Sequence, residues 1–280
     1  MLDTRLNAYR NDLADVRLKG LVDSKSFCNG TAMQLIVPIA TLHRAPKPDA
    51  PQETQVLLGE TVSVFDVNDD WAWVQLERDG YVGYVQAEFL NAEMHRPSHR
   101  ISVTSTLLYR SASIKTQPVQ FLFMNSEISV VGLQDGFFEL ATGGFIFAAH
   151  AVPISQFQTD FVGVAELLLH TPYLWGGKSA HGIDCSGLVQ TSLNACGQNC
   201  LRDADMQELS LGQNLMINDL ESLKRGDLIF WKGHVGIMRD AETLLHASGH
   251  QMMVVSEPLR TADDRTKAKG KAITSIKRLA

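Results

Sequence analysis

The sequence predicts an α+β protein in which a C-terminal domain of helices and antiparallel strands follows two small β-barrels. Between residues 33 and 90, short runs of alternating apolar and polar residues are separated by turn-forming clusters, as in a small all-β module. A second series with the same texture occupies residues 100–152, which indicates an internal duplication. After Pro153 helical spacing comes first and strands follow, which is typical of the α+β class.

These changes of texture divide the chain into parts. A polar, partly helical lead-in comes first, and residues 92–99 link the two barrels. Within the first barrel, the clusters Asn68-Asp69-Asp70 and Arg78-Asp79-Gly80 are predicted hairpin turns. The predicted bounds are 1–33 for the lead-in, 34–92 for the first barrel, 100–152 for the second barrel and 155–280 for the C-terminal domain.

The C-terminal domain opens with two predicted helices. Asp160 caps the first, which Pro172 ends, and the second extends from about Asp184 to Ala195, with Gly197 as its stop. Strands are expected at 227–231, 234–238, 243–247 and about 252–257.

Charge and composition exclude several classes of protein. The formal net charge is -6, so we expect no binding of nucleic acid or anionic lipid. No stretch reaches about 18 uninterrupted apolar residues, which argues against a membrane-spanning helix. The N-terminus lacks the apolar core of a signal peptide, which favours a cytoplasmic protein. The four cysteines form no disulfide framework and are expected to be reduced thiols.

Cys185 carries the strongest chemical signal. It follows a glycine-rich approach, with Gly176, Gly177 and Gly182, and stands in the first turn of the helix that Asp184 caps. The positive end of the helix dipole favours a thiolate there, and the first-turn N–H groups could bind an oxyanion.

The alternative is that Cys185 is a buried small apolar residue, which is the usual fate of a free cysteine. Cys28, Cys196 and Cys200 lack such a context, and we interpret them as structural. Cys196 and Cys200 have no second pair of ligands with suitable spacing, so no metal site is predicted.

Two histidines are predicted to meet across a hairpin. A three-residue turn at 239–241 would pair Met238 with Glu242 and would place His234 directly opposite His246 on one face of the sheet. One imidazole could then orient the other toward the thiol. The alternative is a pair of half-exposed strand histidines. The other seven histidines fall in loops, linkers or unmatched positions, and we interpret them as surface residues.

Together these segments resemble the NlpC-type family of papain-like cell-wall cysteine peptidases. The resemblance covers residues 155–260 and rests on five motifs: Tyr173-x-Trp175-Gly176-Gly177, Asp184-Cys185-Ser186-Gly187, Gly226-Asp227-Leu228-Ile229-Phe230, His234-Val235-Gly236-Ile237 and His246-Ala247. It implies a catalytic triad in which Cys185 is the nucleophile, His234 the general base and His246 the orienting residue. It implies no metal or organic cofactor.

The chain further resembles the subgroup with two N-terminal SH3-like domains, of the dipeptidyl-peptidase VI type. That resemblance implies hydrolysis of γ-D-glutamyl-L-diamino acid bonds in murein peptides with a free N-terminal L-Ala. In the segment Arg202-Asp203-Ala204-Asp205-Met206-Gln207, Asp203 would bind the substrate amine, and Ala204 stands where many relatives have serine. The other implied substrate-binding residues are Ser186, Tyr173, and Tyr81 and Glu60 of the first barrel, which would wall off the pocket.

Two other functions stay open at this stage. One is a different acyl-transfer reaction on the same scaffold, by an amidase, transpeptidase or lipid acyltransferase. The other is a catalytically silent adaptor that binds wall peptides through its barrels. The sequence does not indicate the oligomeric state or the preferred diamino acid.

Overall fold

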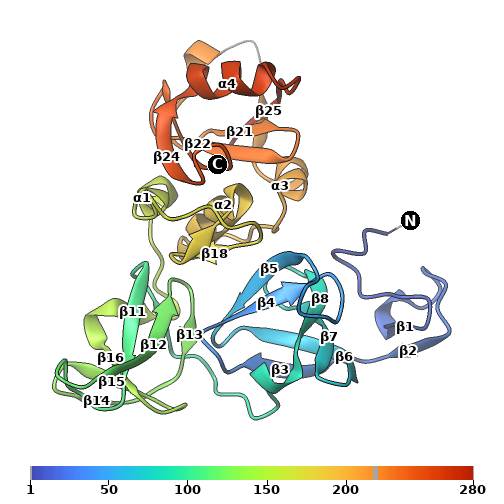
Figure 1. Ribbon diagram of the computed structural model, residues 1–280, viewed down its shortest axis with the longest axis vertical. Helices are drawn as coiled ribbons and strands as arrows, with labels where there is room; N and C mark the ends of the chain where they lie inside the picture. The colour runs from blue at the N-terminus through green and yellow to red at the C-terminus, as the bar shows by residue number, and fades with distance from the viewer. Residues whose placement is uncertain (1, 217–219, 280) are drawn as a thin grey trace. The chain divides into compact units, whose positions relative to one another are not determined.

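The computed structural model describes residues 2–216 and 220–279, which form two compact units, Met1–Gln156 and Phe157–Ala280 (Figure 1). No helix in the described ranges is long and apolar enough to cross a membrane. Each unit has its own apolar core, so each is described by itself.

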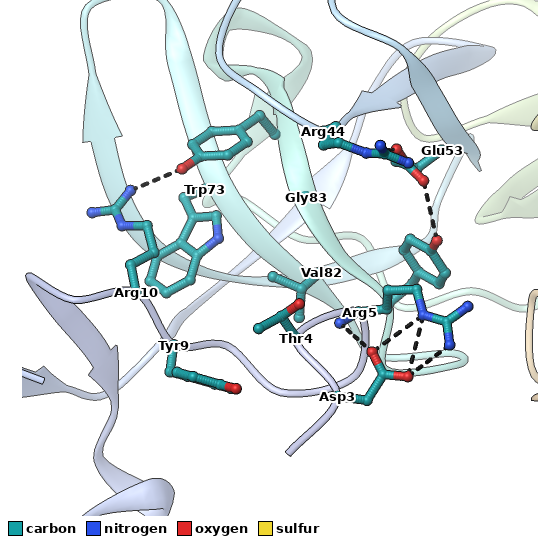
Figure 2. A pocket seen from close by; sticks show the side chains of 12 residues that line it. Asp3, Thr4, Arg5, Tyr9, Arg10, Arg44, Glu53, Trp73, Val82 and Gly83 are labelled. Atoms are coloured by element: carbon teal, nitrogen blue, oxygen red, sulfur yellow. Dashed lines mark hydrogen bonds and ion pairs between the residues drawn. The ribbon is translucent and has the colours of Figure 1, made fainter. Parts of the chain in front are cut away.

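Residues 2–30 differ from the predicted helical lead-in. The structure has two short parallel strands here, β1 (Leu13–Asp15) and β2 (Ser26–Cys28), with the 3₁₀ turn η1 (Val16–Leu18) between them. The segment is held by the neighbouring sheet: the Arg10 guanidinium lies 4.3 Å from the centroid of the Trp73 ring (Figure 2). It also forms an ion pair with Asp66. Such long-range contacts outweigh the weak local preference for a helix.

The first sheet contains seven strands in the order β5-β4-β8-β7-β6-β3-β9. Asp69, with a φ of 51°, and Gly80, with a φ of 77°, lie in the β6–β7 and β7–β8 connections, so both predicted hairpin turns are confirmed. The 3₁₀ turn η2 (Ala87–Phe89) precedes the last strand. The strands are β3 (Thr31–Leu35), β4 (Ile39–His43), β5 (Gln52–Leu57), β6 (Thr61–Asn68), β7 (Trp71–Leu76), β8 (Val82–Gln86) and β9 (Leu90–Asn91).

The rest of the first unit repeats much of this arrangement. Its five-stranded sheet has the order β12-β11-β16-β15-β14, and a three-stranded sheet has the order β13-β10-β17. The 3₁₀ turn η3 (Ala148–His150) takes the place of η2. The strands are β10 (His99–Ile101), β11 (Ser105–Tyr109), β12 (Pro118–Phe123), β13 (Glu127–Ile128), β14 (Val130–Gln134), β15 (Phe137–Leu140), β16 (Phe145–Phe147) and β17 (Ala151–Pro153).

The second unit is built around a six-stranded sheet with the order β20-β25-β21-β22-β23-β24. The four strands expected from the sequence form its continuous antiparallel centre and edge. A two-stranded β18–β19 ribbon and the 3₁₀ turn η4 (Leu220–Ser222) lie outside it. The strands are β18 (Lys178–Ser179), β19 (Gly182–Ile183), β20 (Gln213–Leu215), β21 (Leu228–Trp231), β22 (His234–Met238), β23 (Thr243–Ser248), β24 (Met253–Pro258) and β25 (Ile273–Arg278).

Helices cover both faces of this sheet (Figure 1). Because side chains alternate along a strand, Leu228 and Phe230 of β21 pack toward α1 and α2, whereas Ile229 and Trp231 pack toward α4. This explains why all of β21 is buried. The helices are α1 (Phe161–Glu166), α2 (Cys185–Ala195), α3 (Ala204–Ser210) and α4 (Leu259–Lys267).

Candidate active site

Cys185 is the first residue of α2, as the sequence predicts. The Asp184 carboxylate caps the helix by accepting hydrogen bonds from the backbone N–H groups of Gly187, at 2.7 Å, and Gly176, also at 2.7 Å. A Cβ atom on Gly187 would lie 2.2 Å from the carbonyl oxygen of Gly177, so only glycine allows the loop to approach the helix this closely.

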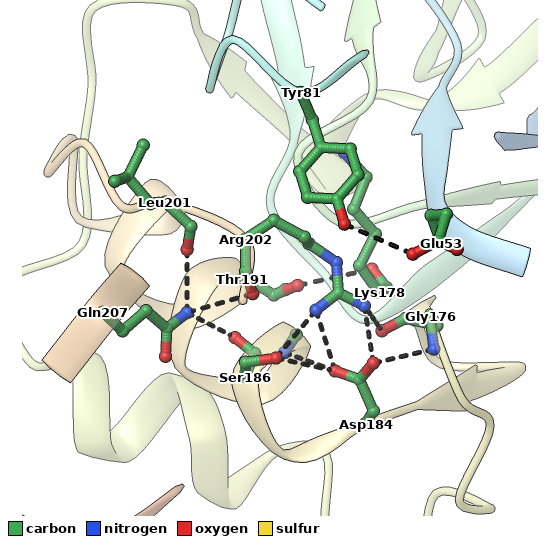
Figure 3. Close-up of polar contacts among 12 residues, drawn as sticks. Glu53, Tyr81, Gly176, Lys178, Asp184, Ser186, Thr191, Leu201, Arg202 and Gln207 are labelled. Carbon is green, nitrogen blue, oxygen red and sulfur yellow. Dashed lines mark hydrogen bonds and ion pairs between the residues drawn. The ribbon is translucent and has the colours of Figure 1, made fainter. Parts of the chain in front are cut away.

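Arg202 fixes the capping carboxylate of Asp184 in place (Figure 3). Its guanidinium donates to both carboxylate oxygens of Asp184, at 2.9 and 2.7 Å, and to the hydroxyl of Ser186, at 2.9 Å. The Arg202 side chain is 1% exposed, so this is a buried bidentate ion pair. Sequence reasoning assigned Arg202 no role, and its only signal was its position beside Asp203.

Ser186 is turned into the same network. Its hydroxyl contacts Asp184 and Arg202, and its carbonyl oxygen accepts a hydrogen bond from the Gln207 side chain at 2.9 Å (Figure 3). The residue is buried. These contacts give the Ser186 side chain a structural task next to the nucleophile, and its role in contacting substrate stays a prediction.

The surroundings of Cys185 oppose the expected thiolate. Burial and then the negative charge of Asp184 raise the pKa of Cys185 to about 12, although a hydrogen bond from the Val235 N–H, the charge of Arg202 and the Ser186 N–H act in the opposite direction. The first helical turn alone therefore does not ionise the sulfur, because desolvation costs more than the dipole contributes. The thiol needs a base.

His234 and His246 supply a hydrogen-bonded imidazole pair. His234 Nε2 lies 2.7 Å from His246 Nδ1, and the ring centroids are 5.0 Å apart at an interplanar angle of 71°. The backbone N–H of Val235 donates a hydrogen bond to Cys185, and Val235 directly follows His234 in β22. Burial lowers the pKa of His234 to about 3, so this imidazole is neutral and able to accept a proton.

The predicted strand register was wrong by two residues. In the structure Met238 pairs with Leu244, and the turn spans residues 240–242. Asp240 shifts the turn, since its carboxylate accepts from the N–H groups of Glu242 and Thr243. A shift of two residues keeps side chains on the same face, so the two imidazoles meet diagonally rather than directly.

Glu257 extends the imidazole pair and was missed by sequence reasoning. Its Oε1 lies 2.8 Å from His246 Nε2, and Arg265 of α4 donates to both of its oxygens, with Nη1 2.9 Å from Oε2. Burial opposes ionisation of Glu257, but hydrogen bonds from His246 and Arg265 outweigh it and lower the pKa of its carboxyl to about 2. Glu257 follows no recognisable motif, because its position depends on how β24 pairs with β23.

Known proteins are similar to this chain in sequence and fold. A family model described as "NlpC/P60 family" matches residues 170–268, and another described as "Bacterial dipeptidyl-peptidase Sh3 domain" matches residues 42–90. The chain is 31% identical to a protein of Bacillus subtilis named gamma-D-glutamyl-L-lysine dipeptidyl-peptidase. The 221 aligned residues cover 70% of this chain and 72% of that protein. The chain belongs to the NlpC/P60 family.

Two further relatives agree with this membership. Dipeptidyl-peptidase 6 of Lysinibacillus sphaericus is 26% identical over 238 residues, which cover 76% of this chain and 86% of that protein. A crystal structure of an NlpC/P60 family protein from Bacillus cereus has the same fold, with a TM-score of 0.74 and 22% identity over 88% of this chain and 99% of that one. This NlpC/P60 chain is therefore a hydrolase of the cysteine peptidase class.

The remaining expected site residues of this NlpC/P60 unit lie near the ends of its helices. Tyr173 is half-buried, and burial followed by the charge of Cys185 raises the pKa of its phenol above the usual range, so it stays a hydrogen-bond donor. Asp203 is the N-cap residue of α3 and is half-buried, as is Ala204 after it. Their roles toward substrate stay predictions.

The two residues expected from the first barrel have different surroundings. The Tyr81 hydroxyl lies 3.4 Å from the Glu53 carboxylate (Figure 3). Both residues line a cavity of about 460 Å³ between the lead-in and the first sheet (Figure 2). Glu60 is buried, and its carboxylate accepts from the Leu57 N–H at 2.9 Å and pairs with Arg78 at 2.6 Å. Within this unit, Glu53 is thus the acidic partner of Tyr81, and Glu60 stabilises the fold.

The raised pKa of Cys185 predicts how its alkylation depends on pH. Because the thiolate is the reacting form, the rate with iodoacetamide in the absence of substrate should rise about tenfold per pH unit from pH 7 to 10. Mass spectrometry of the Cys185 peptide measures this rate, and the Cys185→Ala variant reports the background from the other thiols. A plateau below pH 8 would show that the sulfur is already ionised.

Proposed function

We propose that the protein hydrolyses the γ-D-glutamyl-L-diamino acid bond of murein peptides that begin with a free L-Ala, and releases L-Ala-D-Glu. The observation that carries this proposal is the hydrogen-bonded His234–His246 pair at the strand that donates to Cys185. The names of the relatives from Bacillus subtilis and Lysinibacillus sphaericus support the reaction type and the class of substrate.

In the proposed reaction, Cys185 is the nucleophile and His234 the general base. The thiol proton passes to His234 as the sulfur attacks the carbonyl carbon of the γ-glutamyl bond. Backbone N–H groups of the first turn of α2 stabilise the oxyanion, and the neutral phenol of Tyr173 is a further donor for the substrate. The imidazolium of His234 then protonates the leaving amine, and water hydrolyses the thioester.

Asp203 is the proposed receptor for the substrate amine. A carboxylate that faces an ammonium group selects a free chain end, since an acylated amine would leave the carboxylate without its cation. Ser186 contributes to the same end of the site by positioning the backbone around the nucleophile. Ala204, in place of serine, removes one hydrogen bond to the substrate.

The selection of a free amine is tested with two peptides, L-Ala-γ-D-Glu-L-Lys and its N-acetylated form. We expect kcat/KM to be about 10–100-fold lower for the acetylated peptide, because the Asp203 carboxylate then has no substrate ammonium group to bind. Mass spectrometry of the released dipeptide measures both rates. Asp203→Asn should slow cleavage of the free peptide and leave the acetylated one unchanged.

Three outcomes decide the proposal. Equal cleavage of both peptides would refute the selection of a free amine. Absence of cleavage with either peptide, together with a Cys185 that no alkylating agent modifies, would favour a peptide-binding adaptor. Transfer of the acyl group to an added amine in place of water would favour the transpeptidase alternative.

We also propose that residues 100–152 form a second SH3-like module. The strand orders β5-β4-β8-β7-β6 and β12-β11-β16-β15-β14 support this, and so does the edge-to-face ring contact of His43 with Trp71, which corresponds to that of Tyr109 with Phe137. The cytoplasmic location expected from the sequence stays a prediction.

A further inference from the structure

The hydrogen-bonded pair His234–His246 continues to a third member. Glu257 on β24 contacts the ring nitrogen of His246 that does not face His234. In the strand pairing His246 is opposite Val255, so Glu257 reaches it diagonally from two residues farther along the same face. The chain of contacts therefore crosses three neighbouring strands, β22, β23 and β24.

The direction of these hydrogen bonds follows from the chemistry of their ends. An ionised carboxylate only accepts, so His246 carries its proton on Nε2. With both imidazoles neutral, His246 Nδ1 then accepts from His234 Nε2–H. This leaves Nδ1 of His234 as the nitrogen with a lone pair, which is the one that must receive the thiol proton.

Helix α4 supports both imidazoles from the face of the sheet that carries them, opposite α1 and α2. Arg265 holds the Glu257 carboxylate through both guanidinium nitrogens. Asp263, two residues before Arg265, accepts from the Trp231 indole N–H at 3.3 Å, and the centroid of the Trp231 ring lies 5.7 Å from that of the His234 ring. The helix thus orients the partners of both histidines, although none of its residues is adjacent to them in the sequence.

We propose that Glu257, held by Arg265, is a positioning residue that sets the tautomers of His246 and His234 and stabilises the imidazolium formed when His234 takes the thiol proton. The inference rests on the proposed roles of Cys185 and His234. Glu257 contacts His246 and Arg265, so we place its action on His234 through His246.

The charges around His234 give this role an electrostatic reason. His246, Lys271 and Arg265 disfavour its protonated form, and Glu257 is the group that favours it. When the thiol proton moves to His234, the new positive charge forms near the cations Lys271 and Arg265. A single negative charge at the end of the imidazole chain offsets part of that cost.

Two substitutions separate the effect of the Glu257 charge from that of its hydrogen bond to His246. Glu257→Gln keeps the shape and an acceptor but removes the charge, whereas Glu257→Leu removes both. We expect kcat to fall about tenfold in Glu257→Gln and about 100-fold in Glu257→Leu, with KM unchanged in both, the range known for outer partners of metal-bound histidines. Glu242→Gln is the matched control, because Glu242 is exposed in the hairpin turn of the same sheet.

Nuclear magnetic resonance of ¹⁵N-histidine-labelled protein reports the tautomer of His246, which a loss of folding or stability would not change in the same way. Two-bond ¹H–¹⁵N correlations should show His246 protonated on Nε2 in the wild type and Glu257→Gln, and a mixture of tautomers in Glu257→Leu. The resonances are assigned from the His246→Ala spectrum. If Glu257→Leu fails to fold, Glu257→Gln still tests the charge, since it preserves the packing.

The outcomes distinguish this inference from the proposed function. If the wild type cleaves the tripeptide and Glu257→Gln matches it in kcat, the charge has no role and the inference fails. Protonation of His246 on Nδ1 in the wild type would overturn it as well. If the wild type does not cleave the tripeptide at all, the proposed function fails, while the tautomer measurement still decides whether Glu257 orients the pair.

Discussion

Cys185→Ala is expected to lower kcat for the tripeptide by at least about 10⁴-fold, because no other group can form the thioester. The loss should be confined to chemistry. The cap on α2 comes from Asp184, whose partners Arg202, Gly176 and Gly187 do not involve the sulfur, so the site keeps its shape. Isothermal titration calorimetry with the tripeptide should therefore detect binding by the inactive variant.

Cys196→Ala is the matched control for this loss. Cys196 is the C-cap residue of the same helix and is half-buried, so its replacement makes the same chemical change about three helical turns away. We expect turnover of the Cys196→Ala variant to equal that of the wild type. Residual turnover of Cys185→Ala above one thousandth of the wild-type rate would show that the nucleophile has been misassigned.

Arg202→Met is expected to cost about 3–5 kcal/mol of stability, because it leaves the Asp184 carboxylate buried without its cation. The effect should be largest at the start of α2, where Asp184 caps the helix. The chain has two compact units, so a single unfolding transition is not assumed. Hydrogen exchange followed by mass spectrometry on peptides of α2 measures the loss locally.

Arg225→Met is the control for this effect. Arg225 pairs with Asp160 and Glu166 on the surface, where its side chain is 40% exposed, and exposed ion pairs contribute at most about 1 kcal/mol. The double variant Arg202→Met/Asp184→Asn should recover part of the loss, since it removes the unpaired charge. Equal protection of α2 in Arg202→Met and Arg225→Met would contradict the structural role of the buried pair.

Local pattern was sufficient for the parts of the site that lie within one element or one hairpin. The start of α2 at Cys185 follows from an adjacent cap, Asp184, and a glycine-rich approach, which act over a few residues. The contact between His234 and His246 was predicted correctly although the predicted register was wrong by two residues, because a shift of two residues keeps both side chains on the same face of the sheet.

Contacts between distant segments could not be predicted in this way. Arg202 reaches Asp184 from 18 residues away, and Arg265 reaches Glu257 only because α4 folds back over the sheet. The protonation state of Cys185 also escaped the local argument. A helix start favours the thiolate, whereas burial, which depends on the packed fold, raises the pKa of the Cys185 thiol.

The sequence by itself determined the family, the nucleophile candidate and the two histidines, because these depend on motifs and on the period of a strand. Only the tertiary structure decided which groups surround them: the Arg202 pair under the helix cap, and Glu257 with Arg265 behind His246. The partners of these ionised groups are set when distant strands and helices pack against each other. Neither burial nor the direction of a hydrogen bond has a sequence pattern from which the partners could be predicted.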